Sequence, residues 1–148
     1  FLNFVAVPIE HQGLTVHFRA VGKTAGAKGV PVAVDLRHRN VMPLSVVGLV
    51  GVRSEDGALS LSWHRRARFN GDLRDGGDVP LCETCEAYEI DVTASAILLR
   101  TIKAGGESAT YSAAQQVEDG IAPGSVVTCS VFQLSSVAGR GFPSSISV

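Results

Sequence analysis

Apolar and polar residues alternate with a period of two along several short stretches of the chain. In residues 58–64, Leu59, Leu61 and Trp63 fall on one side of an extended backbone, while two serines and a histidine fall on the other. Residues 87–93 repeat the pattern, with tyrosine, isoleucine and valine opposite two acidic side chains. Successive side chains of a strand point to opposite faces, so both stretches are predicted to be strands with one buried face.

Further apolar runs, separated by turn-forming residues, predict the other strands at 44–52, 96–102, 108–113, 125–134 and 142–148. In the fourth of these runs, Val127, Cys129 and Val131 share the face expected to point inward. No window keeps a helical spacing over three turns, and residues 112–120 predict two helical turns at most. About seven short strands at this spacing indicate an all-β protein built as a small sandwich.

The N-terminal part of the chain predicts a separate β-hairpin. Two strand-like runs, 13–21 and 30–38, are joined by a segment rich in Gly, Ala and Lys. Two strands alone are marginally stable in water, so the hairpin is expected to pack on the sandwich or on another part of a longer chain. We therefore expect residues 1–43 to be a hairpin segment from a preceding β domain and residues 44–148 to form the sandwich. The opening residues do not read as a signal peptide, and they resemble the start of a fragment or of a processed chain.

Composition limits the classes of function. The chain has 148 residues, of which 45% are hydrophobic, enough for a packed core. Thirteen basic and fourteen acidic residues give a net charge of -1, which provides no excess of positive charge for sequence-independent binding to nucleic acid. The longest apolar runs are far shorter than the roughly 20 residues that a membrane-spanning helix needs. A nucleic-acid-specific or membrane-spanning protein is therefore not expected.

Two of the three cysteines, Cys82 and Cys85, form a CxxC. A tetrahedral zinc site needs further ligands, and His64 is a candidate third ligand for an incomplete site. The alternatives are a Cys82–Cys85 disulfide and two plain thiols in a loop. Redox catalysis is not expected, because the motif does not begin a helix that would lower a thiol pKa. We therefore expect no resident metal and no cofactor.

Aspartates at steps of three in 72–78 could offer carboxylates to calcium, but they lack the alternate spacing and closing glutamate of an EF-hand loop. The simpler interpretation is that neighbouring arginines pair with them. The chain also has no G-x-S-x-G, and none of its four histidines lies in a triad pattern. An enzyme is therefore not expected.

Several short motifs occur together in a fixed order. They are W-x-R-R-x-R at 63–68, a G-D…D-G segment at 71–76, V-P-L at 79–81, E-x-Y-x-I at 86–90 and a segment starting Q-L-S and ending G-F-P at 133–143. The layout resembles a fibronectin type III domain. Within that fold it is similar to the C-terminal end of the large tail-tip host-specificity proteins of siphophages and gene transfer agents, the "megatron" group. The family pattern has V-P-L-G-E where this chain has V-P-L-C-E, so the cysteines are a departure from it.

The resemblance implies a structural protein of a phage or phage-like tail tip or baseplate. It implies a homotrimer that contacts other tail-tip or baseplate proteins and a host cell-surface receptor, and that acts in assembly, host attachment or genome delivery. The expected location is the virion, and the extracellular space after release. A rival hypothesis is an accessory carbohydrate- or protein-binding fibronectin type III module of a secreted enzyme.

The long connection 65–86 is the candidate contact surface, because the corresponding fibronectin type III connection is usually short and long loops on rigid sandwiches often bind partners. The alternative is a self-packed loop that covers a sheet edge. The candidate contact residues are Arg65, Arg66, Arg68, Asp72, Arg74, Asp75 and Asp78.

Overall fold

The computed structural model describes residues 7–11, 13–22, 26, 28–37, 39, 41–71 and 79–148. The chain divides into two compact units, Phe1–Val41 and Met42–Val148. Each unit is described by itself.

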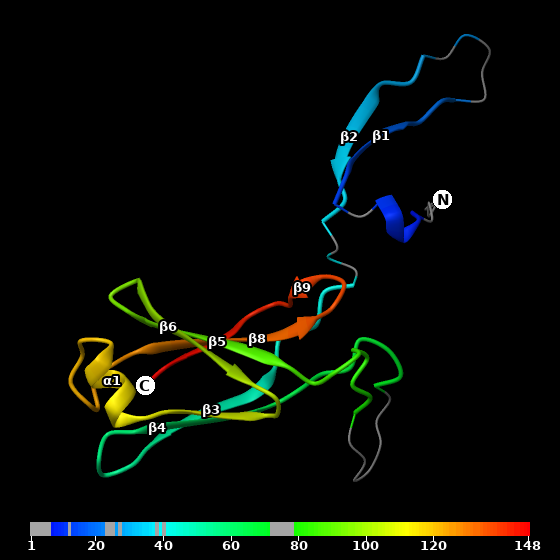
Figure 1. Ribbon diagram of the computed structural model, residues 1–148. Coiled ribbons are helices and arrows are strands. Elements are labelled where there is room, and N and C mark those ends of the chain that lie inside the picture. The colour runs from blue at the N-terminus through cyan, green and yellow to red at the C-terminus, as the bar shows by residue number, and fades with distance from the viewer. Residues whose placement is uncertain are drawn as a thin grey trace. The chain divides into compact units, whose positions relative to one another are not determined.

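The first unit is built around a two-stranded hairpin (Figure 1). Its elements are a 3-10 helix η1 (Ile9–His11), β1 (Thr15–Arg19) and β2 (Pro31–Asp35). The strands are antiparallel, and the register pairs Val16 with Val34 and Phe18 with Val32. Directly opposed side chains lie on one face of a sheet, so these four apolar residues share a face. The hairpin predicted from the sequence is confirmed.

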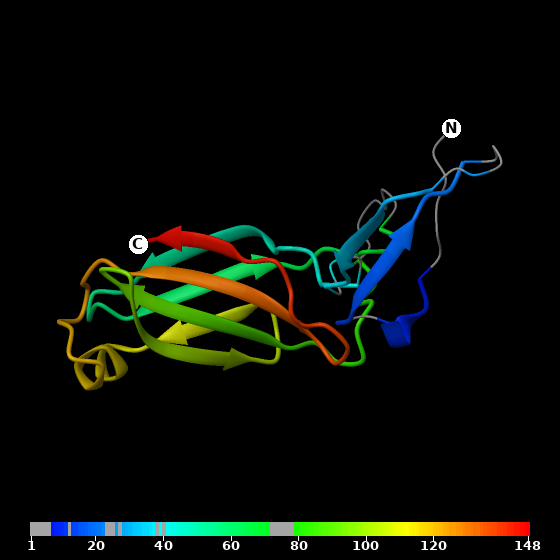
Figure 2. The same cartoon turned by 90° about the horizontal axis from the view of Figure 1, so that it is seen from above.

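The second unit is a sandwich of two antiparallel sheets (Figures 1 and 2). Its strands are β3 (Val47–Arg53), β4 (Leu59–His64), β5 (Tyr88–Ala94), β6 (Ile97–Ala104), β7 (Ser108–Tyr111), β8 (Thr128–Ser135), β9 (Gly139–Arg140) and β10 (Ser144–Ser147). One sheet has the order β3-β4-β7, and the other has the order β10-β8-β5-β6 with the short β9 also paired to β8. The all-β sandwich expected from the sequence is confirmed.

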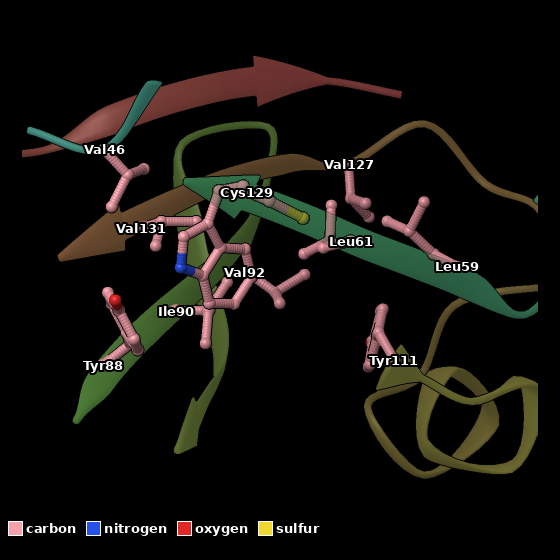
Figure 3. Packing of buried hydrophobic residues seen from close by; sticks show 11 residues of the cluster. Val46, Leu59, Leu61, Tyr88, Ile90, Val92, Tyr111, Val127, Cys129 and Val131 are labelled. Atoms are coloured by element: carbon pink, nitrogen blue, oxygen red, sulfur yellow. The ribbon is translucent and has the colours of Figure 1, made fainter. Parts of the chain in front are cut away.

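The apolar residues of the alternating stretches form the core between the two sheets. Every second residue of β4 and of β8 is buried, and so are Tyr88, Ile90 and Val92 of β5 (Figure 3). The rings of Trp63 and Tyr88 meet edge to face, with centroids 5.2 Å apart. Both side chains are about 1% exposed, so they pack in the core as predicted and do not form a surface for stacking sugars. Cys129 is likewise buried, between its neighbours on the inward face of β8.

The connection from β7 to β8 contains the only helix of the second unit's described residues, α1 (Ala113–Glu118). It begins with a capping box, in which the Ser112 side chain accepts from the Gln115 backbone and the Gln115 side chain accepts from the Ser112 backbone. This short helix fits the prediction of two turns at most. Within the described part of the chain, no helix is long and apolar enough to cross a membrane.

Candidate contact loop between β4 and β5

The connection between β4 and β5 covers residues 65–87 and is called the β4–β5 loop below. Figures 1 and 2 place it at the end of the sandwich opposite α1, where β8 also turns into β9. The candidates Asp72, Arg74, Asp75 and Asp78 lie outside the described residues, so their role and their pairing with arginines stay predictions. The described parts, 65–71 and 79–87, include the other three candidate arginines.

Arg65 joins the start of the loop to its end. Its side chain is only 12% exposed. The guanidinium donates to the carbonyl of Val79 at 2.9 Å and to Glu86 Oε1 at 3.3 Å. The backbone N–H of Arg65 donates to Glu107 Oε1 at 2.8 Å, which ties the loop to the turn between β6 and β7. A largely buried charged group needs hydrogen-bond partners, and Arg65 finds them at both ends of the loop. Arg65 therefore holds the two ends of the loop together.

Arg68 makes the second internal connection. It forms an ion pair with Glu83, whose side chain is 5% exposed, and it also donates to the Cys82 carbonyl at 3.1 Å. Arg66 is exposed and turns outward from the loop to the segment before β3, where it donates to the carbonyl and hydroxyl of Ser45, both at 2.7 Å. All three arginines therefore contribute hydrogen bonds that hold the loop on its own domain.

The loop is also tied to the core through Glu86. Tyr88 donates its hydroxyl to Glu86 Oε1 at 2.9 Å. Burial, reinforced by this carboxylate, raises the pKa of Tyr88 far above its ordinary value. The phenol is therefore a hydrogen-bond donor at neutral pH, and it connects the loop to the buried Trp63–Tyr88 pair.

A second loop lies against the first. The hydroxyls of Thr84 and Ser136 are 3.2 Å apart, and Ser136 belongs to the turn between β8 and β9. After β9, the Phe142 N–H donates to the Pro43 carbonyl at 3.0 Å. A Cβ on Gly141 would lie 2.6 Å from the same carbonyl oxygen, so this close approach requires glycine.

The sequence did not reveal which residues accept hydrogen bonds from the loop arginines. It also did not reveal which apolar side chains are exposed at this end of the sandwich. The glutamates 83, 86 and 107 accept from the arginines. Glu83 ends V-P-L-C-E and Glu86 begins E-x-Y-x-I, but neither motif pointed to these pairings, and Glu107 lies outside the motifs. Phe69 in the β4–β5 loop is 63% exposed, and Val137 in the β8–β9 turn is 57% exposed. Exposed apolar side chains on ordered loops are available for contact with another molecule.

The structure does not bring the candidate metal ligands together. Cys82 and Cys85 are free thiols, and His64 Nδ1 lies 3.2 Å from Glu107 Oε2. Among the described residues, no group of three or more His, Cys, Asp or Glu side chains is arranged to hold a metal ion. The third thiol, Cys129, is buried, and this burial raises its pKa to about 11.

Comparisons with known proteins reveal likeness in structure only. No protein-family model matches the chain, and no curated protein matches it. The extracellular domains d3–d4 of rat CD45 match 99% of this chain and 69% of their own, with 12% identity and a TM-score of 0.53. A fibronectin type III domain derived from the human KIAA0970 protein matches 76% of each chain, with 12% identity and a TM-score of 0.50. Fibronectin type III domains are typically non-catalytic structural or adhesion modules. The chain therefore contains a β-sandwich of the fibronectin type III kind, with a β-hairpin before it in the sequence.

Proposed function

We propose that this chain is a structural component of a phage or phage-like tail tip, in which the β4–β5 loop contacts a neighbouring protein. The proposal rests on the resemblance of its ordered motifs to the tail-tip host-specificity proteins. It assigns no catalytic step to the domain. The proposed partners are other tail-tip or baseplate proteins and a host receptor, with the chain acting as a homotrimer in the virion and outside the cell after release.

One observation carries the proposal: those motifs of the resemblance that lie in the described part of the chain meet around the β4–β5 loop. Arg65 from the first motif binds Glu86 from the fourth, and the tryptophan and tyrosine of the same two motifs pack together. Thr84 in the loop contacts Ser136 in the last motif. Residues that are far apart in the sequence thus contact one another around the β4–β5 loop. This is expected if the protein needs the shape of that loop for its function.

The internal hydrogen bonds suit a contact role. The described segments 65–71 and 79–87 are held by these bonds before any partner binds, so they lose less conformational freedom on binding and more of the contact free energy remains for affinity. A symmetric trimer would present three such loops, and linked weak contacts give an avidity far above that of a single contact. The hairpin fits the same proposal as part of a preceding β domain, because its apolar face needs a covering layer.

Immunogold electron microscopy of particles from the source culture, with an antibody against residues 44–148, tests the proposal. Gold confined to tail tips is the expected result. Antibody pre-absorbed with the purified chain is the control for non-specific label. Particles without label, together with antigen in the secreted fraction, would refute the tail-tip proposal and favour a module of a secreted enzyme.

The role of the loop is tested separately in particles that bear Arg68→Ala. If loop shape matters, these particles should adsorb to host cells more slowly, or lack the neighbouring tail protein. Glu55→Ala removes an exposed charge from the turn between β3 and β4, at the α1 end of the sandwich, and serves as the control. Equal adsorption and composition for both variants would reject the β4–β5 loop as the contact surface.

A further inference from the structure

We propose that Cys82 and Cys85 are a redox modification site, a thiol pair that a small-molecule disulfide converts into a disulfide within the β4–β5 loop. This inference goes beyond the proposed function and holds whatever partner the loop contacts. Neither the fold nor the motif resemblance supplies it, because the family pattern has glycine at the first cysteine position.

The backbone between the two cysteines is curved. It bends at each of residues 83, 84 and 85. In an extended chain, Cα atoms three residues apart are separated by about 10 Å, whereas a disulfide requires about 4.4–6.8 Å. The bend thus brings the Cα atoms of Cys82 and Cys85 closer together than in an extended chain, as a disulfide requires.

Arg68 holds this bend in place. Its guanidinium donates to the Cys82 carbonyl at 3.1 Å and pairs with the neighbouring carboxylate of Glu83. Both charged side chains are largely buried, at 12% and 5% exposed. The curved segment is therefore fixed before oxidation, and closing the disulfide requires little further ordering of the backbone.

The two thiols differ in access, which sets the order of events. Cys85 is exposed, whereas Cys82 is half-buried and donates its S–H to the Phe69 carbonyl at 3.5 Å. Cys129 lies in the core, where burial keeps it protonated at neutral pH and shielded from reagents. An external oxidant is therefore expected to meet Cys85 first, with Cys82 as the resolving thiol.

The reaction is two thiol–disulfide exchanges. The Cys85 thiolate attacks the small-molecule disulfide and displaces one small thiol, leaving a mixed disulfide. The Cys82 thiolate then attacks the Cys85 sulfur and displaces the second small thiol. The protein loses two electrons and two protons, and the external disulfide takes up both as it becomes two thiols.

Oxidation also changes the start of the loop. The disulfide removes the Cys82 proton, so the Phe69 carbonyl loses its S–H donor. Phe69 is the largest exposed apolar side chain in the described part of the loop. Oxidation of the cysteine pair therefore removes a hydrogen bond from Phe69, the residue whose ring is exposed at the start of the loop.

The test uses the full chain, first reduced and then equilibrated with oxidised glutathione under native conditions. Trypsin cleaves after Lys and Arg, so residues 75–100 hold both loop cysteines and residues 104–140 hold Cys129 in a separate peptide. After unfolding in an alkylating reagent, the 75–100 peptide should lack two hydrogens and remain unalkylated. The count of free thiols should fall from three to one.

Two variants sharpen the test. Cys82→Ser removes the resolving thiol and should accumulate a glutathione adduct on Cys85. Cys129→Ala leaves the loop pair intact and should oxidise like the parent chain. Three free thiols after equilibration, a glutathione adduct that persists on Cys85 in the parent chain, or a cross-link between the two peptides would overturn the proposal.

Discussion

At the scale of single residues, one buried amide organises the α1 end of the sandwich. Gln116 is fully buried; its Nε2 donates to the Gly57 carbonyl at 2.9 Å and to the Tyr111 carbonyl at 3.2 Å. Its Oε1 accepts from the Gly124 N–H at 2.9 Å. It therefore joins the β3–β4 turn, the end of β7 and the connection after α1. Nothing in the sequence distinguished Gln116 from Gln115, because both are polar residues in one short helix.

Replacing the Gln116 side chain should destabilise the fold. We expect Gln116→Leu to lower the free energy of unfolding by about 2–3 kcal/mol, because buried backbone groups lose their partners while the shape is nearly kept. Urea denaturation measures the change. Val117→Ala, at a residue 61% exposed on the same helix, is the control and should stay within about 0.5 kcal/mol of the parent chain. Equal stability of the two variants would contradict this role for Gln116.

Asp119 should make stability depend on pH in the acid range. Hydrogen bonds from Arg100, at 2.9 Å to each carboxylate oxygen, hold the pKa of Asp119 below its usual value, and a bond from Tyr111 adds to this. A carboxyl with a lowered folded-state pKa adds stability above its unfolded pKa of about 3.9 and loses it as pH falls toward the folded value. The gap in urea midpoint between parent and Asp119→Asn should therefore narrow below about pH 4. A gap that stays constant with pH would rule out this linkage.

At the scale of elements, the β5–β6 hairpin turns through two residues without glycine. Ser95 has a φ of 49° and Ala96 a φ of 65°. Two-residue turns of this kind favour Asn-Gly, because both positions need positive φ. The sequence predicted a turn here but gave no sign that its residues would be strained.

Relieving that strain should stabilise the protein. We expect Ala96→Gly to raise the free energy of unfolding by about 0.5–1 kcal/mol, since the left-handed penalty exceeds the added entropy of the unfolded chain. Ala122→Gly is the control, because Ala122 is exposed and does not have a positive φ. It should be neutral or destabilising. Thermal or urea unfolding checks both variants, and a loss of stability in Ala96→Gly would show that the turn is not strained.

In the described parts of the β4–β5 loop, Arg65 and Arg68 hold the two ends of the loop together. We expect Arg68→Ala to speed amide hydrogen exchange in residues 79–86 by about tenfold or more, while β5 and β8 keep their protection. The reason is that Glu83 loses its partner in a largely buried site. Glu55→Ala, in the β3–β4 turn at the α1 end, should leave loop exchange unchanged. Unaltered exchange in the Arg68 variant would mean that the loop is ordered by other contacts.

At the scale of the whole molecule, the core that the described residues form lies within one unit. Its buried apolar residues run from Val46 to Val131, all in the unit Met42–Val148. We expect a chain of residues 42–148 to unfold cooperatively, with a midpoint within about 2 °C of the full chain and with Trp63 shielded from water. A peptide of residues 1–41 should remain largely unfolded, because two strands rarely hold together alone. Failure of 42–148 to fold would show that the sandwich needs the hairpin.

The candidate site was only partly predictable. The position of the long loop followed from the spacing between two strands, and the inward face of Trp63 followed from alternation. The partners of Arg65 and Arg68 did not: the described carboxylate partners are glutamates up to 42 residues away in sequence. The predicted aspartate partners lie outside the described residues. Ion pairs depend on where the chain returns in space, and no local pattern encodes that.

By itself, the sequence determined the all-β class, the N-terminal hairpin, the short helix and the inward face of each core strand. These follow from periods of two and from turn-forming residues, which act over a few neighbours. Only the tertiary structure decided that Gln116 is buried, that Ser95 and Ala96 are left-handed, and that Arg65 and Arg68 bind within their own loop. The physical reason is that burial and pairing arise from segments that meet only after folding, so a single stretch of residues cannot specify them.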